Sequence, residues 1–211
     1  LKKANPFFQK EFNKDRALGA TFEDRLEELA LLESQLSGMD QQHQQAWARQ
    51  LETLATRDAS PEMRARATKV IATLPFEEAV RALNTASTDD SEKVRLAACA
   101  AWKRRGDAEG RKMLMSLAVR SDETTSVRQA AIDALSVYDD AEVRAQMTSW
   151  LDDSSPAVQY QVAQSLKTMT GRDYGGDFES WKQYLAGNDV PPPPPKSLTA
   201  NILESIPGLR R

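Results

Sequence analysis

The chain has 211 residues, of which 40% are hydrophobic and 28% charged, and its formal net charge at pH 7 is −3. A chain of this size and apolar content can bury a substantial core, whereas its slightly acidic balance disfavours nucleic-acid carriers, which usually show an excess of Lys and Arg. Its single cysteine excludes an internal disulfide, and its single histidine provides no metal-ligand spacing.

The first 20 residues are predicted to form an N-terminal arm. Pro6 and Gly19 interrupt this segment, and three phenylalanines are its only large apolar side chains. These phenylalanines either pack on the folded part that follows or anchor a partner. The chain begins with Leu1 rather than Met, which allows for a processed N-terminus.

A helix is predicted to follow the arm and to cap the fold at its N-terminal end. Thr21 and Asp24 have the spacing of a capping box. Apolar residues then recur at helical spacing until Ser37 and Gly38 end the pattern. The members of this stripe are Phe22, Leu26, Leu29 and Leu36.

A pattern of about thirty residues recurs four times between residues 40 and 170. Apolar or small residues lie three, four, seven and eight positions after Val94, as on a helix with one buried face. Equivalent stripes begin at Met63, Val127 and Val158, so the four anchors lie 31, 33 and 31 residues apart. A fixed period of this length with helical texture indicates a solenoid of helix pairs.

Each anchor helix is preceded by a second apolar stripe, which predicts the first helix of each pair. The first stripe begins near His43, the second near Phe76, the third near Leu114 and the fourth near Val143. We therefore predict an all-α fold over residues 21–186, namely a right-handed α-solenoid of about four helical hairpins with N- and C-terminal capping helices.

The C-terminal cap is predicted after three glycines that end the last repeat helix. Asp177 can begin a short helix. The apolar residues of this helix are Phe178, Trp181 and Leu185.

Residues 187–196 are predicted to be a proline-rich linker, in which five prolines form a stiff polyproline II spacer of roughly 15 Å. Residues 197–211 are predicted to be an amphipathic docking peptide, too short to be a stable helix alone. It docks on its own solenoid, on a partner protein or, least favoured, on a membrane surface, since only two arginines supply positive charge. Its apolar residues are Leu198, Ile202, Leu203 and Ile206.

The repeats resemble HEAT repeats of the short bacterial kind. The segments that carry the resemblance are VRLAACAAW at 94–102 and VRQAAIDAL at 127–135. In that family a turn Asp and the Arg after the valine form a ladder between successive units, so the resemblance implies structural roles here. The matching positions are Asp58, Asp89, Asp122, Asp153, Arg64, Arg95 and Arg128. An Asp at a helix start can also cap free amides.

The sequence predicts no catalytic residue, cofactor or metal. Its only histidine, His43, lies one turn before Trp47 on a helix face, and neither a glycine-rich phosphate loop nor a nucleophile elbow occurs. Cys99 is expected to be a small packed residue. A HEAT-like enzyme or nucleic-acid binder that uses the concave face, such as a bilin lyase or DNA glycosylase, is the alternative, but no diagnostic motif of either is present.

The predicted function is that of a non-enzymatic scaffold or adaptor for protein partners. Residues two, five, six and nine positions after each anchor face away from the stripe, and apolar side chains flanked by charge suit a protein or peptide ligand. The sequence contains no apolar run long enough to span a membrane, and it leaves a cytoplasmic or cell-envelope location open. The predicted partner-binding residues are Leu96, Lys103, Gln129, Ile132, Tyr160 and Lys167, with Leu198, Ile202, Leu203 and Ile206 of the docking peptide.

Overall fold

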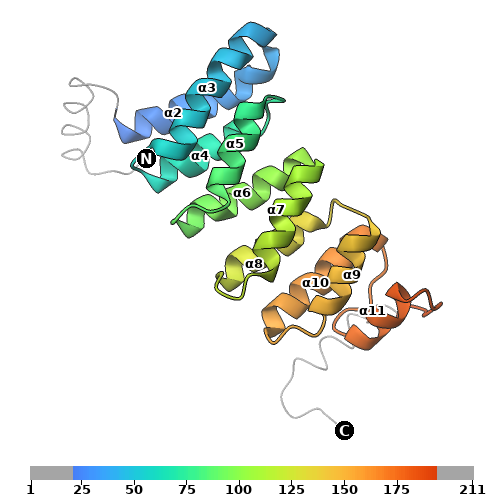
Figure 1. The fold of residues 1–211 in the computed structure, drawn as a ribbon. Coiled ribbons are helices and arrows are strands. Elements are labelled where there is room, and N and C mark those ends of the chain that lie inside the picture. The colour runs from blue at the N-terminus through green and yellow to red at the C-terminus, as the bar shows by residue number, and fades with distance from the viewer. Residues whose placement is uncertain (1–20, 194–211) are drawn as a thin grey trace, which may run out of the picture. The chain divides into compact units, whose positions relative to one another are not determined.

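A computed structural model describes residues 21–193 of the chain. The predicted arm, the docking peptide and the end of the linker lie outside the described residues. Within the described range the chain is all-helical, with ten α-helices, one short 3-10 helix and no strand (Figure 1). The predicted all-α solenoid is therefore confirmed for this range.

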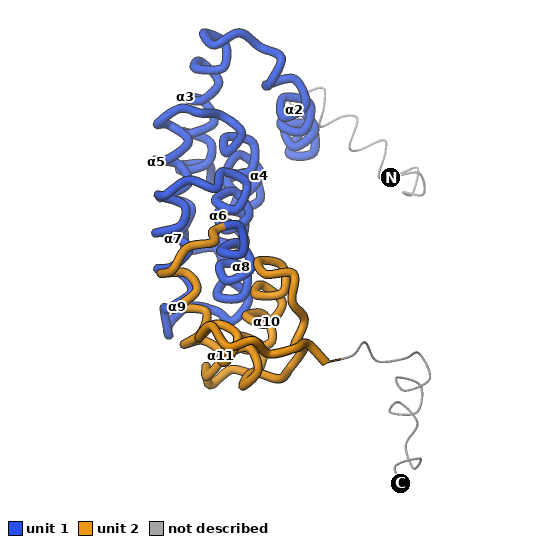
Figure 2. Tube along the Cα trace, turned by 90° about the vertical axis from the view of Figure 1, so that its right-hand side faces the viewer, with its two compact units in different colours: residues 1–137 blue, residues 138–211 orange. Residues whose placement is uncertain are grey.

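The chain divides into two compact units, residues 1–137 and 138–211 (Figure 2). The helices of the first unit are α2 (Phe22–Gln35), η1 (Leu36–Gly38), α3 (Gln41–Arg57), α4 (Pro61–Ile71), α5 (Glu77–Ala86), α6 (Glu92–Arg105), α7 (Ala108–Val119) and α8 (Thr125–Leu135). Those of the second unit are α9 (Ala141–Trp150), α10 (Pro156–Thr170) and α11 (Phe178–Leu185).

The helices of the first unit form two rows (Figure 2). The inner row, as we name it here, consists of α2, α4, α6 and α8, and each of these helices packs on the next. The outer row consists of α3, α5 and α7, which pair with α4, α6 and α8 respectively. The predicted N-terminal cap, α2, thus occupies the place of an inner-row helix that precedes the first hairpin.

Local sequence signals set the helix ends. Thr21 and Asp24 form the predicted capping box, in which the Asp24 amide donates to Thr21 Oγ1 over 3.2 Å and the Thr21 amide to Asp24 Oδ2 over 2.9 Å. Ser60 caps α4 by accepting from the Met63 amide, with Pro61 in the first turn. Gly106 ends α6 in the left-handed conformation, with φ of 62°, which a side chain would disfavour.

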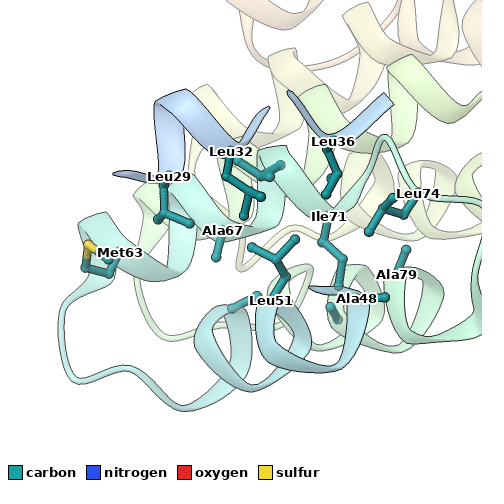
Figure 3. Close-up of a cluster of buried hydrophobic side chains, with 13 residues drawn as sticks. Leu29, Leu32, Leu36, Ala48, Leu51, Met63, Ala67, Ile71, Leu74 and Ala79 are labelled. Atoms are coloured by element: carbon teal, nitrogen blue, oxygen red, sulfur yellow. The ribbon is translucent and has the colours of Figure 1, made fainter. Parts of the chain in front are cut away.

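Small side chains let the helices of the first unit approach closely. Leu29 and Leu32 of α2 meet Leu51 of α3 and Ile71 of α4 in one buried cluster (Figure 3). Fully buried alanines separate the large side chains within this cluster, namely Ala48, Ala55, Ala67, Ala79 and Ala82. Close packing of this kind favours short helix-to-helix distances and makes the core sensitive to added or removed methylenes.

In the second unit, α10 and α11 both pack on α9. Trp181 of α11 is fully buried, and its ring lies 4.8 Å from that of Tyr174 in an edge-to-face arrangement. Asp177 caps α11 by accepting from the Ser180 amide over 3.1 Å, as predicted. The C-terminal cap is therefore a short helix held by an aromatic pair.

The start of the predicted linker is attached to this cap. Tyr174 Oη donates to the backbone oxygen of Val190 over 2.6 Å. Pro191 and the two following prolines are exposed and belong to no helix. The described part of the proline spacer therefore begins directly after a fixed point on the cap.

Arginines of the inner row join successive repeats. Arg64 of α4 makes a two-pronged contact with Asp89, with Nε–Oδ2 and Nη2–Oδ1 distances of 2.8 Å. Arg95 of α6 makes the equivalent contact with Glu123, over 2.9 and 2.8 Å. Arg25 of α2 pairs with Asp58 at the corresponding place, through a single contact between Nη2 and Oδ2. Because the guanidinium is planar, each two-pronged contact fixes orientation as well as distance.

The predicted ladder was wrong at Asp122, because Glu123 rather than Asp122 pairs with Arg95. Asp122 instead forms an exposed pair with Arg120. The repeat that contains these residues is 33 rather than 31 residues long, and its acid lies four rather than five positions before the anchor. The Glu123 side chain is one methylene longer than that of Asp and reaches Arg95 from this shifted position. Only 2% of this side chain is exposed.

The turn aspartates also do not act as N-caps. Asp89 Oδ1 accepts from the amide of Ser91, which is itself the N-cap residue of α6, over 2.8 Å. Asp58 accepts from the amide of Ser60 in the same way. Each aspartate therefore orders the residue at which the helix begins, while its other oxygen receives an arginine.

Glu123→Gln should lower the free energy of unfolding by about 3 kcal/mol, because it leaves the Arg95 guanidinium without its buried anionic partner. Asp122→Asn, the matched control one residue away, removes only an exposed pair and should cost less than about 1 kcal/mol. Urea unfolding of both variants measures the difference. Equal losses of unfolding free energy in the two variants would contradict the assignment of Glu123 as the partner of Arg95.

The same contacts make stability depend on pH. Burial on its own raises the pKa of Glu123, but hydrogen bonds from Arg95 and from the Thr124 amide outweigh it, and the net pKa is lowered from its ordinary value of 4.5. For Asp89 the pKa is lowered from 3.8 because bonds from Arg64 and the Ser91 amide likewise exceed the effect of burial.

A lowered carboxyl pKa stabilises the fold above the unfolded-state value, and this stabilisation is lost as the pH falls through the folded-state value. We therefore expect the free energy of unfolding to fall as the pH drops from the ordinary pKa values of 4.5 and 3.8 into the more acidic range. Urea titrations across that range check this. A Glu123→Gln variant with the same pH slope as the parent chain would contradict it.

Candidate interaction surface

The structure distributes the predicted partner-binding residues over both units. Leu96 and Lys103 lie on α6 and Gln129 on α8, all three partly exposed. Tyr160, which is 60% exposed, and Lys167 lie on α10 of the second unit. Leu198, Ile202, Leu203 and Ile206 lie outside the described residues.

Ile132 was predicted to be exposed, and this was wrong, since the side chain is 0% exposed. The position five residues after the anchor is buried in all four repeats, in Thr68, Cys99, Ile132 and Ala163. A helix such as α6 packs on α4 and α8 along its row and also on its outer-row neighbours. It therefore buries more of its circumference than the single stripe that the sequence analysis assumed.

Ion pairs between neighbouring helices cover much of the inner row. Glu33 of α2 pairs with Arg66 of α4 over 3.0 Å and with Arg104 of α6 over 3.3 Å. Lys103 of α6 pairs with Asp133 of α8 over 2.8 Å.

The N-terminal ends of the same helices are linked in the same way. Glu62 of α4 pairs with Lys93 of α6. Glu92 of α6 accepts a hydrogen bond from the Thr124 hydroxyl, just before α8, over 3.1 Å. These contacts hold long side chains in place across the row.

A shallow hollow of about 440 Å³ interrupts this network between α4 and α6. We call it the Leu96 hollow. Its floor is apolar and its rim charged, and it is lined by Lys69, Glu92, Lys93, Leu96, Ala97 and Ala100. Within the described part of the chain, the Lys69 ammonium forms no ion pair. The hollow thus combines apolar surface with a cation whose charge is not yet matched.

Leu96 is among the predicted partner-binding residues, whereas Lys69 and Ala100 are not. Both occupy the position six residues after their anchors, which the repeat alignment predicted to be exposed. The repeat pattern therefore indicated that both side chains would be exposed. The grouping of Lys69 with Leu96 depends on the packing of α4 against α6, which the sequence does not specify.

A second hollow, at the start of α3, is less suited to binding. It is larger, about 770 Å³, but its lining is polar, with Ala46 as its largest apolar side chain. The other members of the lining are Asp40, Gln41, Gln42, Gln45 and Arg49. Such a surface offers little apolar area for a partner to bury.

The histidine and the cysteine of the described range lie in different surroundings, one exposed and one buried. His43 is exposed and pairs with Asp40 on the surface, with 2.7 Å between Nδ1 and Oδ2. Burial raises the pKa of the Cys99 thiol to about 12, which keeps it protonated at neutral pH. Among residues 21–193, no group of three or more His, Cys, Asp or Glu side chains could hold a metal ion.

Comparison with known proteins agrees with this architecture. The two rows of paired helices define an α-solenoid of short helical hairpins. The sequence profile of HEAT repeats matches residues 48–136 and 112–174, which is more than half of the chain. The chain therefore belongs to the HEAT-repeat family. No curated protein was found to match it.

None of the helices between residues 21 and 193 is long and apolar enough to cross a membrane.

Ile132→Ala should lower the free energy of unfolding by about 2 to 5 kcal/mol, because it leaves a cavity in a closely packed core. Tyr160→Ala removes a larger side chain but mostly from solvent, so it should cost about 0.5 kcal/mol or less. Chemical unfolding of the two variants tests the revised burial pattern. A costly Tyr160→Ala together with a harmless Ile132→Ala would restore the original interpretation.

Proposed function

We propose that this protein is a non-enzymatic scaffold or adaptor that binds protein partners through the inner row of its first unit. The observation that carries the proposal is the Leu96 hollow, an apolar floor with a charged rim. HEAT repeats are commonly protein-interaction scaffolds and generally mediate protein–protein contacts. Protein interfaces typically combine an apolar centre with a polar rim, which is the arrangement around Leu96.

The paired charges around the hollow favour binding energetically. Ordering a flexible side chain at an interface costs about 0.5 to 1.5 kcal/mol. Lys93 and Lys103 are already held by Glu62 and Asp133, so part of this ordering is complete before a partner arrives. Burial of the partly exposed Leu96 side chain then contributes favourably, up to the roughly 1.5 to 3 kcal/mol of full burial.

A nucleic-acid ligand, the alternative, has less support. The inner-row cations Arg66, Lys93 and Lys103 each have an acidic partner on a neighbouring helix. A phosphate backbone would therefore have to displace these acids before it gained the attraction of the cations. The non-enzymatic part of the proposal is supported by the exposed His43 pair and by the protonated Cys99 thiol.

The docking peptide is proposed as a second binding element of the adaptor. Its apolar residues lie outside the described residues, so this element rests on the sequence pattern. The cap supports it indirectly, since Tyr174 fixes Val190 immediately before the prolines. A stiff spacer that leaves from a fixed point can present a short peptide to a partner at a defined distance.

Ala100→Arg tests the inner-row surface. Ala100 is exposed, so the variant should keep its melting temperature, while the new side chain covers the hollow and should abolish partner binding. Ala145→Arg, at an exposed alanine of α9, is the matched control and should bind normally. Affinity capture from the source cells followed by mass spectrometry gives the readout. The proposal fails for this surface if Ala100→Arg retains every partner that the control retains.

Deletion of residues 197–211 tests the docking peptide. We expect the melting temperature to stay unchanged and one captured partner to be lost, because the apolar stripe of this segment is predicted to bury itself on that partner. Thermal denaturation and affinity capture of the truncated chain measure the two quantities. A large drop in melting temperature would assign the segment to the fold, and an unchanged partner set would remove its role in tethering.

A further inference from the structure

We infer that the Leu96 hollow recognises an acidic–apolar segment of a protein partner, with an apolar side chain on its floor and a carboxylate paired with Lys69. This inference rests on the proposed function and specifies the chemistry of the partner. Its basis is that some charged side chains around the hollow already have an ion-pair partner, whereas Lys69 has none within residues 21–193.

The cationic groups near the hollow differ in whether they already have partners. Lys93 is paired with Glu62, and one helical turn beyond Ala100, Lys103 and Arg104 are paired with Asp133 and Glu33. Lys69 forms no such pair within residues 21–193. Its ammonium is therefore the group that gains most from an added anion.

The charge of the lining favours an anion over a cation. Lys93 is already matched by Glu62, so the lining holds one cation without an ion-pair partner among the described residues, Lys69, and one acid, Glu92. Glu92 is also engaged by the Thr124 hydroxyl from the next helix. A carboxylate placed beside Lys69 is attracted by a cation that forms no ion pair within residues 21–193, whereas an ammonium placed there would be repelled.

The floor of the hollow sets the second requirement. Leu96, Ala97 and Ala100 present methyl and methylene groups and no side-chain hydrogen-bonding group. A polar side chain seated there would lose water without a replacement partner, which is unfavourable. An apolar side chain, by contrast, adds buried area at no such cost. Because Lys69 and this floor line the same hollow, the occupant must carry an apolar group and an acidic group close to each other.

A protein segment meets both requirements, and a nucleic-acid strand does not. Phosphates repeat along a strand and would meet one unmatched cation here, Lys69, beside acids that already bind its neighbours. Bases offer flat rings for stacking, but no aromatic side chain lines the hollow. The surface thus suits a mixed acidic and aliphatic or aromatic peptide sequence.

Selection of a displayed random peptide library on the immobilised full chain tests the inference. We expect enriched peptides to place Asp or Glu within one helical turn of a large apolar residue. A synthetic peptide from this selection is then titrated by fluorescence anisotropy. Lys69→Glu should weaken its binding by about tenfold, equivalent to about 1.4 kcal/mol.

Charge reversal gives the sharper outcome. Selection repeated on Lys69→Glu should replace the enriched acid by Lys or Arg, because the unmatched charge has changed sign. Lys112→Glu, at an exposed lysine of the outer-row helix α7, carries the same change in net charge and should leave both the affinity and the selected sequence pattern unchanged. Enriched peptides without an acid, or equal effects of the two substitutions, would overturn the assignment of a carboxylate to Lys69.

The Ala100→Arg variant separates this inference from the proposed function. If Ala100→Arg abolishes peptide binding but Lys69→Glu does not affect it, the hollow binds protein and only the carboxylate assignment fails. If both variants bind normally, the peptides bind elsewhere and both proposals fail. Displacement of the peptide by a single-stranded DNA oligonucleotide at low concentration would overturn the inference in favour of a nucleic-acid ligand.

Discussion

The two-pronged contacts of Arg64 with Asp89 and of Arg95 with Glu123 set the relation between successive repeats in the first unit. Each arginine also donates to a carbonyl of the turn before its own helix, over 2.9 Å to Asp58 and 2.6 Å to Asp89. One side chain therefore links the turns on either side of it. Lysine could carry the same charge, but a single ammonium could not fix the angle between turns as a planar guanidinium does.

This fixed relation also produces the surface that we propose to be functional. Because the repeats are held in register, residues at equivalent positions of α4, α6 and α8 lie beside one another. Oppositely charged residues then meet across helices, as Lys103 and Asp133 do. Leu96 and Ala100 interrupt that network, so the same register that stabilises the fold leaves an apolar hollow next to Lys69.

Much of the fold could be predicted from the sequence because the same apolar pattern recurs in each of the four repeats. The anchors, the capping box at Thr21 and the cap at Asp177 depend on local spacing, and all were confirmed. Burial of Ile132 and the choice of Glu123 over Asp122 depend on neighbouring helices and on a repeat two residues longer than its neighbours. For the candidate site, Leu96 was within reach of sequence reasoning, but its proximity to Lys69 arises only from packing.

The central claim is that the inner row around Leu96 is where this protein binds its partners. Methyl NMR spectra of the full chain, recorded during titration with a captured partner or selected peptide, test it most directly. The account predicts that the largest shift changes occur at Leu96, Ala97 and Ala100, with smaller changes along α4 and α6. Changes confined to the outer-row helices α3, α5 and α7, with these three methyl-bearing residues unaffected, would contradict it.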